Sequence, residues 1–139
     1  RAIANTSTPV VGVFNGCFYT DPTTQKPTFK NFLPSSINAS DLVAFVIDAP
    51  DTVFEVNANG VFGVADIFKN FSINNVTGNT ATGISLVQLD VANSGTDSTF
   101  LVQAIDISGD VFNSDVTVSN ANILVRINNH AYKAGTAGL

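Results

Sequence analysis

The chain contains no methionine and no tryptophan, and it has one cysteine and one histidine. A single cysteine cannot form a disulfide within the chain, and Cys17 and His130 together are too few for a structural zinc site, which takes three or four such ligands. The one nucleophilic pair that these residues could form is Cys17 with His130, oriented by Asn128. No local sequence pattern supports this pair, and His130 is expected in solvent. The sequence therefore contains no sign of an enzyme.

Charge is also scarce, because only 12% of the 139 residues are charged and the formal net charge is −5. The basic residues are scattered, so nucleic acid is not an expected partner. No apolar run reaches the roughly 18 residues that predict a membrane-spanning helix. A polar surface with little charge suits the outside of a cell, so we expect an extracellular or cell-surface protein. The chain starts at Arg1, which predicts either removal of a leader or a fragment of a longer protein.

Glutamate is nearly absent, since Glu55 is the only one among eleven acidic residues. Aspartate favours turns over helix interiors, and the abundant Val, Ile, Thr and Phe favour strands. Short apolar segments are separated by turn residues about every 8–12 positions, which is typical of β-sandwiches. We therefore predict an all-β, single-domain antiparallel β-sandwich, immunoglobulin-like or jelly-roll-like, with about eight strands.

The clearest strand signals are two alternating segments and one short apolar run. Residues 83–91 and 98–107 each alternate an apolar row with a mixed row, and we expect them to form a hairpin across the turn at 92–97. Residues 42–48 are apolar on both faces, which predicts a buried central strand. Further strands are expected at 10–14, 17–19, 52–56, 61–65, 116–118 and 123–127.

An Asn-Gly dipeptide at Asn59 and Gly60 predicts a tight hairpin between residues 52–56 and 61–65. The apolar spacing over 61–71 also fits an amphipathic helix. A glycine and several β-branched residues in that segment disfavour the helix, so the hairpin is the first expectation.

A second Asn-Gly dipeptide, Asn15-Gly16, predicts a turn or a bulge. The proline-containing residues 20–36 are expected to form a long surface connection. The expected organisation is an extended N-terminal strand at 1–14, a β-sandwich body at 15–128 and a loosely held C-terminal tail at 129–139.

Three carboxylates, those of Asp106, Asp110 and Asp115, follow one another closely near the end of an expected strand. Calcium takes six to eight oxygen ligands, and β-sandwich loops often supply them, so calcium is the one cofactor that the sequence suggests. The alternative is that these residues serve ordinary turns, for which Asp is also favoured. N-x-S/T triplets mark candidate glycosylation sites, although a chain this rich in Asn, Ser and Thr produces such triplets by chance. They begin at Asn5, Asn38, Asn70 and Asn75.

The expected strands carry few of the charges and prolines that keep sheet edges apart. Among residues 10–14, 52–56 and 123–127, only Glu55 and Arg126 are charged. We therefore expect a non-enzymatic structural subunit that assembles with copies of itself into an extracellular filament, pilus-like fibre, surface layer or virion shell. The alternative is a monomeric module for adhesion or for binding carbohydrate or calcium. The lack of Trp weighs against sugar stacking.

The N-terminal segment 1–14 is a candidate for strand donation to a neighbouring subunit. It contains no helical pattern, and its alternate apolar side chains would set the register of such a strand. The alternative is that residues 8–19 form the first strand of the chain's own sandwich. The residues expected to mediate donation are Val10, Val11, Val13 and Phe14.

Overall fold

The structure is a computed structural model that describes residues 8–35, 37–74, 76–79 and 82–139. The described residues form eight strands in two antiparallel sheets, together with one short 3-10 helix. The predicted all-β class, with about eight antiparallel strands in a sandwich-type arrangement of two sheets, is confirmed. The strands are β1 (Val13–Thr20), β2 (Pro27–Lys30), β3 (Val43–Ile47), β4 (Val53–Asn57), β5 (Asn70–Asn74), β6 (Gln88–Gly95), β7 (Val102–Ile107) and β8 (Asn122–Ile127), and the 3-10 helix is η1 (Val64–Asp66).

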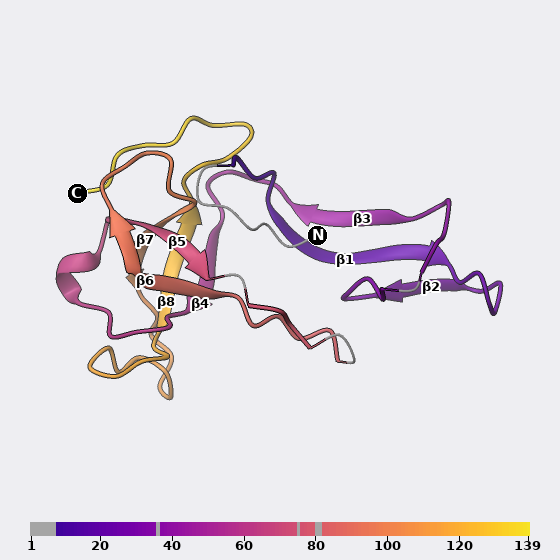
Figure 1. Cartoon of the computed structure of the whole chain (residues 1–139), viewed down its shortest axis with the longest axis horizontal. Coiled ribbons are helices and arrows are strands. Elements are labelled where there is room, and N and C mark those ends of the chain that lie inside the picture. Colours follow the sequence, from indigo (N-terminus) through magenta and orange to yellow (C-terminus); the bar gives the residue numbers. More distant parts are fainter. Residues whose placement is uncertain (1–7, 36, 75, 80–81) are drawn as a thin grey trace.

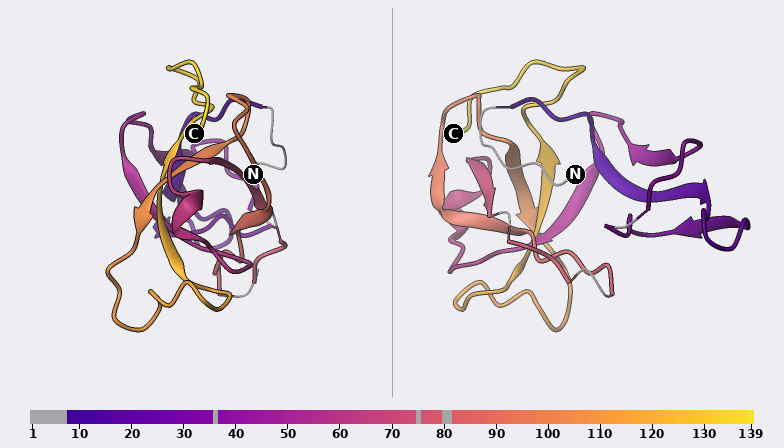
Figure 2. Two further views of the ribbon diagram at one scale, coloured as in Figure 1. Left: turned by 90° about the vertical axis from the view of Figure 1, so that its left-hand side faces the viewer. Right: turned by 45° about the vertical axis from the view of Figure 1, so that its right-hand side comes forward.

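The larger sheet has the order β4-β8-β7-β5-β6 and curls until its two edge strands meet (Figure 2, left). Just beyond β4, Ala58 forms a parallel bridge with Leu89 of β6, and the backbone N–H of Asn59 donates to the Leu89 carbonyl at 3.0 Å. The Asn59 side chain reinforces this junction: its Oδ1 accepts from the Val91 N–H at 3.0 Å and its Nδ2 donates to Asp90 at 3.1 Å. The curl gives the sheet an inner surface that its strands share.

The main hydrophobic core fills the inside of this curled sheet. Its largest side chains, Phe62, Phe71, Leu89 and Ile123, are at most 1% exposed. Full burial of one such side chain contributes about 1.5–3 kcal/mol to folding. Apart from Val10, every residue of this core comes from residue 58 or later. We call residues 53–139 the body, because this part of the chain supplies nearly all of its own core.

The smaller sheet, with the order β2-β1-β3, extends sideways from the body (Figures 1 and 2). We call these three strands and their connections the arm. The chain enters the arm through Val10, which is only 4% exposed and bonds to the body on both sides. Its N–H donates to the Asn129 carbonyl at 3.1 Å, and its carbonyl accepts from the Ala131 N–H at 2.8 Å.

The expected hairpin between 83–91 and 98–107 is wrong in its pairing. Strands β6 and β7 form near these positions, but β5 lies between them and pairs with both. Asn70 of β5 faces Gly95 on one side and Gln103 on the other. No strand is expected from the sequence at residues 70–74, where β5 forms.

The expected pairing of 52–56 with 61–65 is also wrong. Strand β4 forms as expected but pairs with β8, while the chain beyond Asn59-Gly60 turns into η1 rather than a strand. The alternative helix over 61–71 is absent from these described residues as well. The N–H of Phe68, which has a positive φ of 67°, instead donates to the Ala104 carbonyl of β7 at 2.9 Å, and the Ala104 N–H donates to the Lys69 carbonyl at 3.1 Å. The strand expected at 116–118 is a turn.

In the arm, the predicted irregularity at Asn15-Gly16 is confirmed as a bulge, because the β1–β3 register shifts between Phe14 and Gly16. Gly16 has a φ of 127°, which favours glycine. Strand β2 lies inside the region expected to be a plain connection, 20–36. Its Pro27 occupies the first strand position, where a missing N–H is tolerated.

The C-terminal residues 129–139 are not loosely held, contrary to expectation. Two buried asparagines bind them to the body. Asn128 Oδ1 accepts from the Thr136 N–H at 3.0 Å, and Asn70 Nδ2 donates to the Thr136 carbonyl at 2.8 Å and to the Asp97 carbonyl at 3.0 Å. The last residue also participates, since the Leu139 N–H donates to the Phe68 carbonyl at 3.1 Å.

Candidate functional site

The arm presents one continuous apolar surface. Side chains that are paired across antiparallel strands lie on the same face of a sheet. Phe18 of β1 is paired with both Phe29 of β2 and Val43 of β3, so these three share a face. The rings of Phe29 and Phe45 lie 6.0 Å apart across Gly16, whose lack of a side chain leaves them room. We call this surface the arm face: Val13, Phe18, Phe29, Val43, Phe45 and Ile47.

The arm face is open to solvent. Its three phenylalanines, Phe18, Phe29 and Phe45, are 40%, 61% and 45% exposed. Taking about 200 Å² for a whole Phe side chain, these rings alone expose about 300 Å². With the aliphatic members the face presents about 500 Å², which is near the upper end for the largest apolar patch of a monomer. Such an area is expected where another molecule packs.

Strand β3 was expected to be buried and central, and this prediction is wrong. It is an edge strand, and its five residues are all exposed. The sequence nevertheless has the character of a buried strand, since Val43, Ala44, Phe45, Val46 and Ile47 are all apolar. The mismatch between the apolar sequence and the exposed position is the main irregularity of the fold.

The two edges of the arm differ in how they are protected. Strand β2 begins with Pro27 and ends with Lys30, and both residue types discourage a further strand from pairing. Strand β3 contains neither a proline nor a charge. The β3 edge is therefore the more open of the two to association.

The opposite face of the arm is partly covered. Cys17 and Tyr19 are 0% exposed, and the Cys17 thiol lies 3.6 Å from the Phe32 carbonyl. Phe32 is itself held against the turn at Gly83, where an added Cβ would clash with its ring. Burial raises the pKa of the Tyr19 hydroxyl, and the neighbouring Asp21 carboxylate adds to this effect. The arm thus has one face that is covered at Cys17 and Tyr19 but exposed at Phe14 and Val46, and one face that is apolar and open throughout.

The residues expected to donate a strand lie within the chain's own fold. Val10 belongs to the body core, and Val13 and Phe14 pair with Ile47 and Val46 of β3. β1 is the central strand of the arm, so donating it to a neighbour would require exchange of these contacts between copies. Val11 is exposed and lies between the two regions. Donation by this segment stays a prediction, and residues 1–7 lie outside the described part of the chain.

The expected calcium ligands do not converge. Asp106 accepts from its neighbour's N–H, Asp110 accepts from the Phe112 N–H at 3.1 Å, and Asp115 accepts from the Thr117 N–H at 3.0 Å. Each carboxylate thus serves its own local turn. Among the described residues, no group of three His, Cys, Asp or Glu side chains could hold a metal ion. The turn interpretation describes their geometry, and the calcium site stays a prediction.

Cys17 and His130 are engaged separately. Cys17 lies in the arm, whereas His130 packs at the junction with the body and is 3% exposed, contrary to the expectation of a solvated histidine. The Nδ1 of His130 accepts from the Tyr132 N–H at 3.0 Å, and the two rings lie 5.2 Å apart. Asn128, the expected orienting group, is occupied with the C-terminal segment instead.

The candidate glycosylation sites differ in accessibility. Asn38 is exposed, while Asn70 is fully buried and uses its amide to hold the C-terminal segment. The folded chain has no room for a glycan on Asn70, so this candidate is wrong. Asn5 and Asn75 lie outside the described residues.

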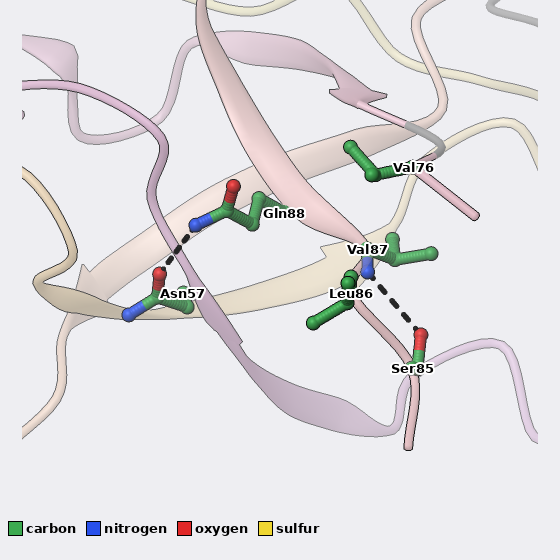
Figure 3. A pocket seen from close by; sticks show the side chains of 6 residues that line it. All are labelled: Asn57, Val76, Ser85, Leu86, Val87 and Gln88. Atoms are coloured by element: carbon green, nitrogen blue, oxygen red, sulfur yellow. Dashed lines mark hydrogen bonds between the residues drawn. The ribbon is translucent and has the colours of Figure 1, made fainter. Parts of the chain in front are cut away.

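An open pocket of about 360 Å³ lies between the end of β4 and the start of β6 (Figure 3). The Gln88 amide donates to Asn57 Oδ1 at 2.8 Å, and the Val87 N–H donates to Ser85 at 3.3 Å. The lining residues include no titratable group and no aromatic ring on which a sugar could stack. They are Asn57, Val76, Ser85, Leu86, Val87 and Gln88.

Comparisons with protein-family models, curated proteins and solved structures found no match for this chain. In the described part of the chain, no helix has the length and apolar character needed to cross a membrane. The arm face is therefore the strongest candidate for a functional surface, and it rests on the chain's own geometry.

Proposed function

We propose that this protein is a structural subunit that self-assembles by burying its arm face against another copy. An extracellular fibre or shell, as the composition suggests, is the kind of assembly that such a subunit would form. The observation that carries the proposal is the exposure of an entire apolar sheet face on an arm that extends from a separately packed body.

The size of the arm face supports this function. If each of two contacting surfaces buried about 500 Å², the contact would remove about 1,000 Å² in total, which is the lower limit for a specific interface. The face carries no charged side chain, so its burial incurs no penalty for an unpaired charge. A hydrophobic contact of this composition is typical of permanent assemblies rather than brief encounters.

Sedimentation velocity over a range of concentrations tests the proposal. The wild-type chain should sediment faster as its concentration rises. A double variant of the arm face, Phe29→Ser with Phe45→Ser, should remain monomeric because it removes the two most exposed rings of that face. Circular dichroism should show that the variant keeps its strands, since the body core is untouched.

A matched control removes exposed apolar residues from the body. Val61→Ser with Val64→Ser changes side chains that are 58% and 68% exposed. This control should assemble like the wild type. A wild-type chain that stays monomeric up to about 1 mM would overturn the proposed function, because weaker association than that could not sustain a structure.

A further inference from the structure

The free edge of β3 is an unpaired row of backbone donors and acceptors along one border of the arm (Figure 1). β3 pairs with β1 on one side, and no backbone hydrogen bond joins residues 43–47 to any other described segment. Alternate residues of an antiparallel edge strand direct their N–H and C=O groups outward. A further strand can pair with such a row, and β3 has neither the charge nor the proline that would discourage it.

The other sheet edges in the described part of the chain are protected. In the larger sheet, the edge strands β4 and β6 meet through Ala58 and Leu89, and they also carry the charges of Glu55 and Asp90. In the arm, β2 is protected by its proline and its lysine. A second copy of the chain therefore offers one open edge, and that edge is again β3.

β3 is complementary to itself in the antiparallel direction. When two copies pair about a two-fold axis at Phe45, each Phe45 lies opposite its counterpart, and each Val43 lies opposite the Ile47 of the other copy. Directly opposite residues share a face of the sheet. The two arm faces therefore lie side by side on the same side of the joined sheet, and apolar side chains meet across the new edge.

The acidic residues nearest to β3 lie outside the paired length. Asp41 precedes the strand and accepts from the Thr20 N–H at 3.1 Å, while Asp48 follows the strand. In the two-fold arrangement, the Asp41 of one copy and the Asp48 of the other lie at the same end. These carboxylates limit the paired length to β3 itself. Salt should strengthen the pairing, because it screens the repulsion between them.

We propose that two copies of the chain pair along their β3 edges, antiparallel, so that two three-stranded arms become one continuous sheet. The pairing rests on the proposed function and adds a second contact to it. The joined sheet presents two arm faces of about 500 Å² each, side by side. A face contact alone only just reaches the lower limit for a specific interface, and pairing of the backbones adds hydrogen bonds and a fixed register. A copy that uses both its edge and its face can contact two neighbours.

Cysteine crosslinking tests the register. Opposite residues of an antiparallel pair have Cα atoms about 4.5–5.5 Å apart, which a disulfide can span. Phe45→Cys should therefore form a disulfide-linked dimer under mild oxidation. Val43→Cys, at an exposed position of the same strand and face, is the matched control and should not, because its counterpart lies about 13 Å further along the strand. A mixture of Val43→Cys with Ile47→Cys should form the link. The wild type should form none, since Cys17 is 0% exposed.

A charge on the edge should remove the contact and leave the arm face intact. The Ala44 side chain lies on the opposite side of β3 from Phe45. Adding Ala44→Lys to Phe45→Cys should abolish the linked dimer, because a lysine on an edge strand discourages pairing. Adding Val61→Lys instead, at a site on the body that is 58% exposed, should leave the link unchanged. Circular dichroism should show that both variants keep their strands.

The outcomes separate the edge pairing from the proposed function. Sheets packed face to face lie about 10 Å apart, too far for a disulfide between two Phe45→Cys chains. If the wild type stays monomeric in sedimentation velocity, both proposals fail. If it assembles but neither Phe45→Cys nor the mixture of Val43→Cys with Ile47→Cys forms a linked dimer, only the edge pairing is overturned.

Two further results would overturn the edge pairing. Equal linking of Phe45→Cys and Val43→Cys would contradict the two-fold register. Linking of Val11→Cys to Phe45→Cys would show that an N-terminal segment, and not a second β3, occupies the edge.

Discussion

The body and the arm are both built from antiparallel strands, yet they differ in how they bury their apolar residues. The body curls, so that Ala58 meets Leu89 and the inner surface becomes a core. The arm has three strands and no such closure, and its apolar face remains open. A second copy can cover this face and remove its apolar area from water. The comparison teaches that an apolar strand composition signals burial without saying which molecule provides it.

Truncation of apolar side chains should show the largest difference in stability between the body and the arm. Leu89→Ala removes a side chain that is 0% exposed at the closure of the body, and should lower the free energy of unfolding by about 2–5 kcal/mol. Val43→Ala changes a residue of the arm that is 51% exposed, and should cost less than about 1 kcal/mol in the monomer. Urea denaturation at low protein concentration measures both. Equal losses at the two sites would contradict the division into a packed body and an open arm.

The attachment of the C-terminal segment to the body should depend on Asn70. Asn70→Ala removes the amide that donates to the Asp97 and Thr136 carbonyls, and should cost about 1–3 kcal/mol because two hydrogen bonds are lost, each worth about 0.5–1.5 kcal/mol. Hydrogen exchange should increase in residues 129–139 while β2 is unaffected. Asn38→Ala, at an exposed site, provides the control. Unchanged exchange of the C-terminal segment in Asn70→Ala would show that other contacts hold it.

The bulge in β1 should be sensitive to a single methyl group. An added Cβ on Gly16 would lie 2.8 Å from the Phe29 ring and 3.0 Å from the Lys30 carbonyl, at a φ of 127° that disfavours other residues. Gly16→Ala should therefore cost about 1–3 kcal/mol, confined to the arm. Amide exchange in β2 should rise while that of β8 stays constant. Gly109→Ala, where an added Cβ meets nothing within 4 Å, should leave both unchanged.

Acid should lower the stability of both the body and the arm, by less than the substitutions above. In the body, the Lys69 side chain and the Gly63 N–H lower the pKa of Asp66, and in the arm hydrogen bonds from Thr20 lower the pKa of Asp41. A carboxylate with a lowered folded-state pKa stabilises the fold above its unfolded pKa, and this stabilisation is lost as the pH falls through the folded value. The melting temperature should therefore decrease below about pH 4, near the ordinary pKa of aspartate. Asp66→Asn should reduce this decrease, and NMR titration of both carboxyl groups should give midpoints below that of aspartate in a short peptide.

Part of the strand content follows from the sequence, because the alternation that predicts strands at 83–91 and 98–107, near β6 and β7, is a local property. The strand pairing does not. Asn70 and Phe71 place β5 between β6 and β7 through long-range burial, which a local pattern does not report. The same limit applies to β3: its apolar sequence predicts a buried central strand, but its exposed place at an edge depends on the rest of the fold.

The sequence predicts the candidate functional site only in part. Unprotected edges at 10–14, 52–56 and 123–127 predicted assembly, but of these residues only Val13 lies on the arm face. The sequence does not show that β1 becomes the central strand of the arm. Phe112, which is 90% exposed, lies next to aspartates that the sequence predicts as calcium ligands or turn residues. Its exposure is a property of the folded loop, and no periodic pattern in a short segment of this kind could reveal it.

The central claim is that the arm face is exposed in a single copy and buried in the assembly. Hydroxyl-radical footprinting with mass spectrometry, performed across a range of protein concentrations, measures this directly. Labelling of Phe29 and Phe45 should decrease as the concentration rises, while labelling of Tyr132, which is 66% exposed on the body, should remain constant. Labelling of Phe29 and Phe45 that stays constant while the protein assembles would contradict the account.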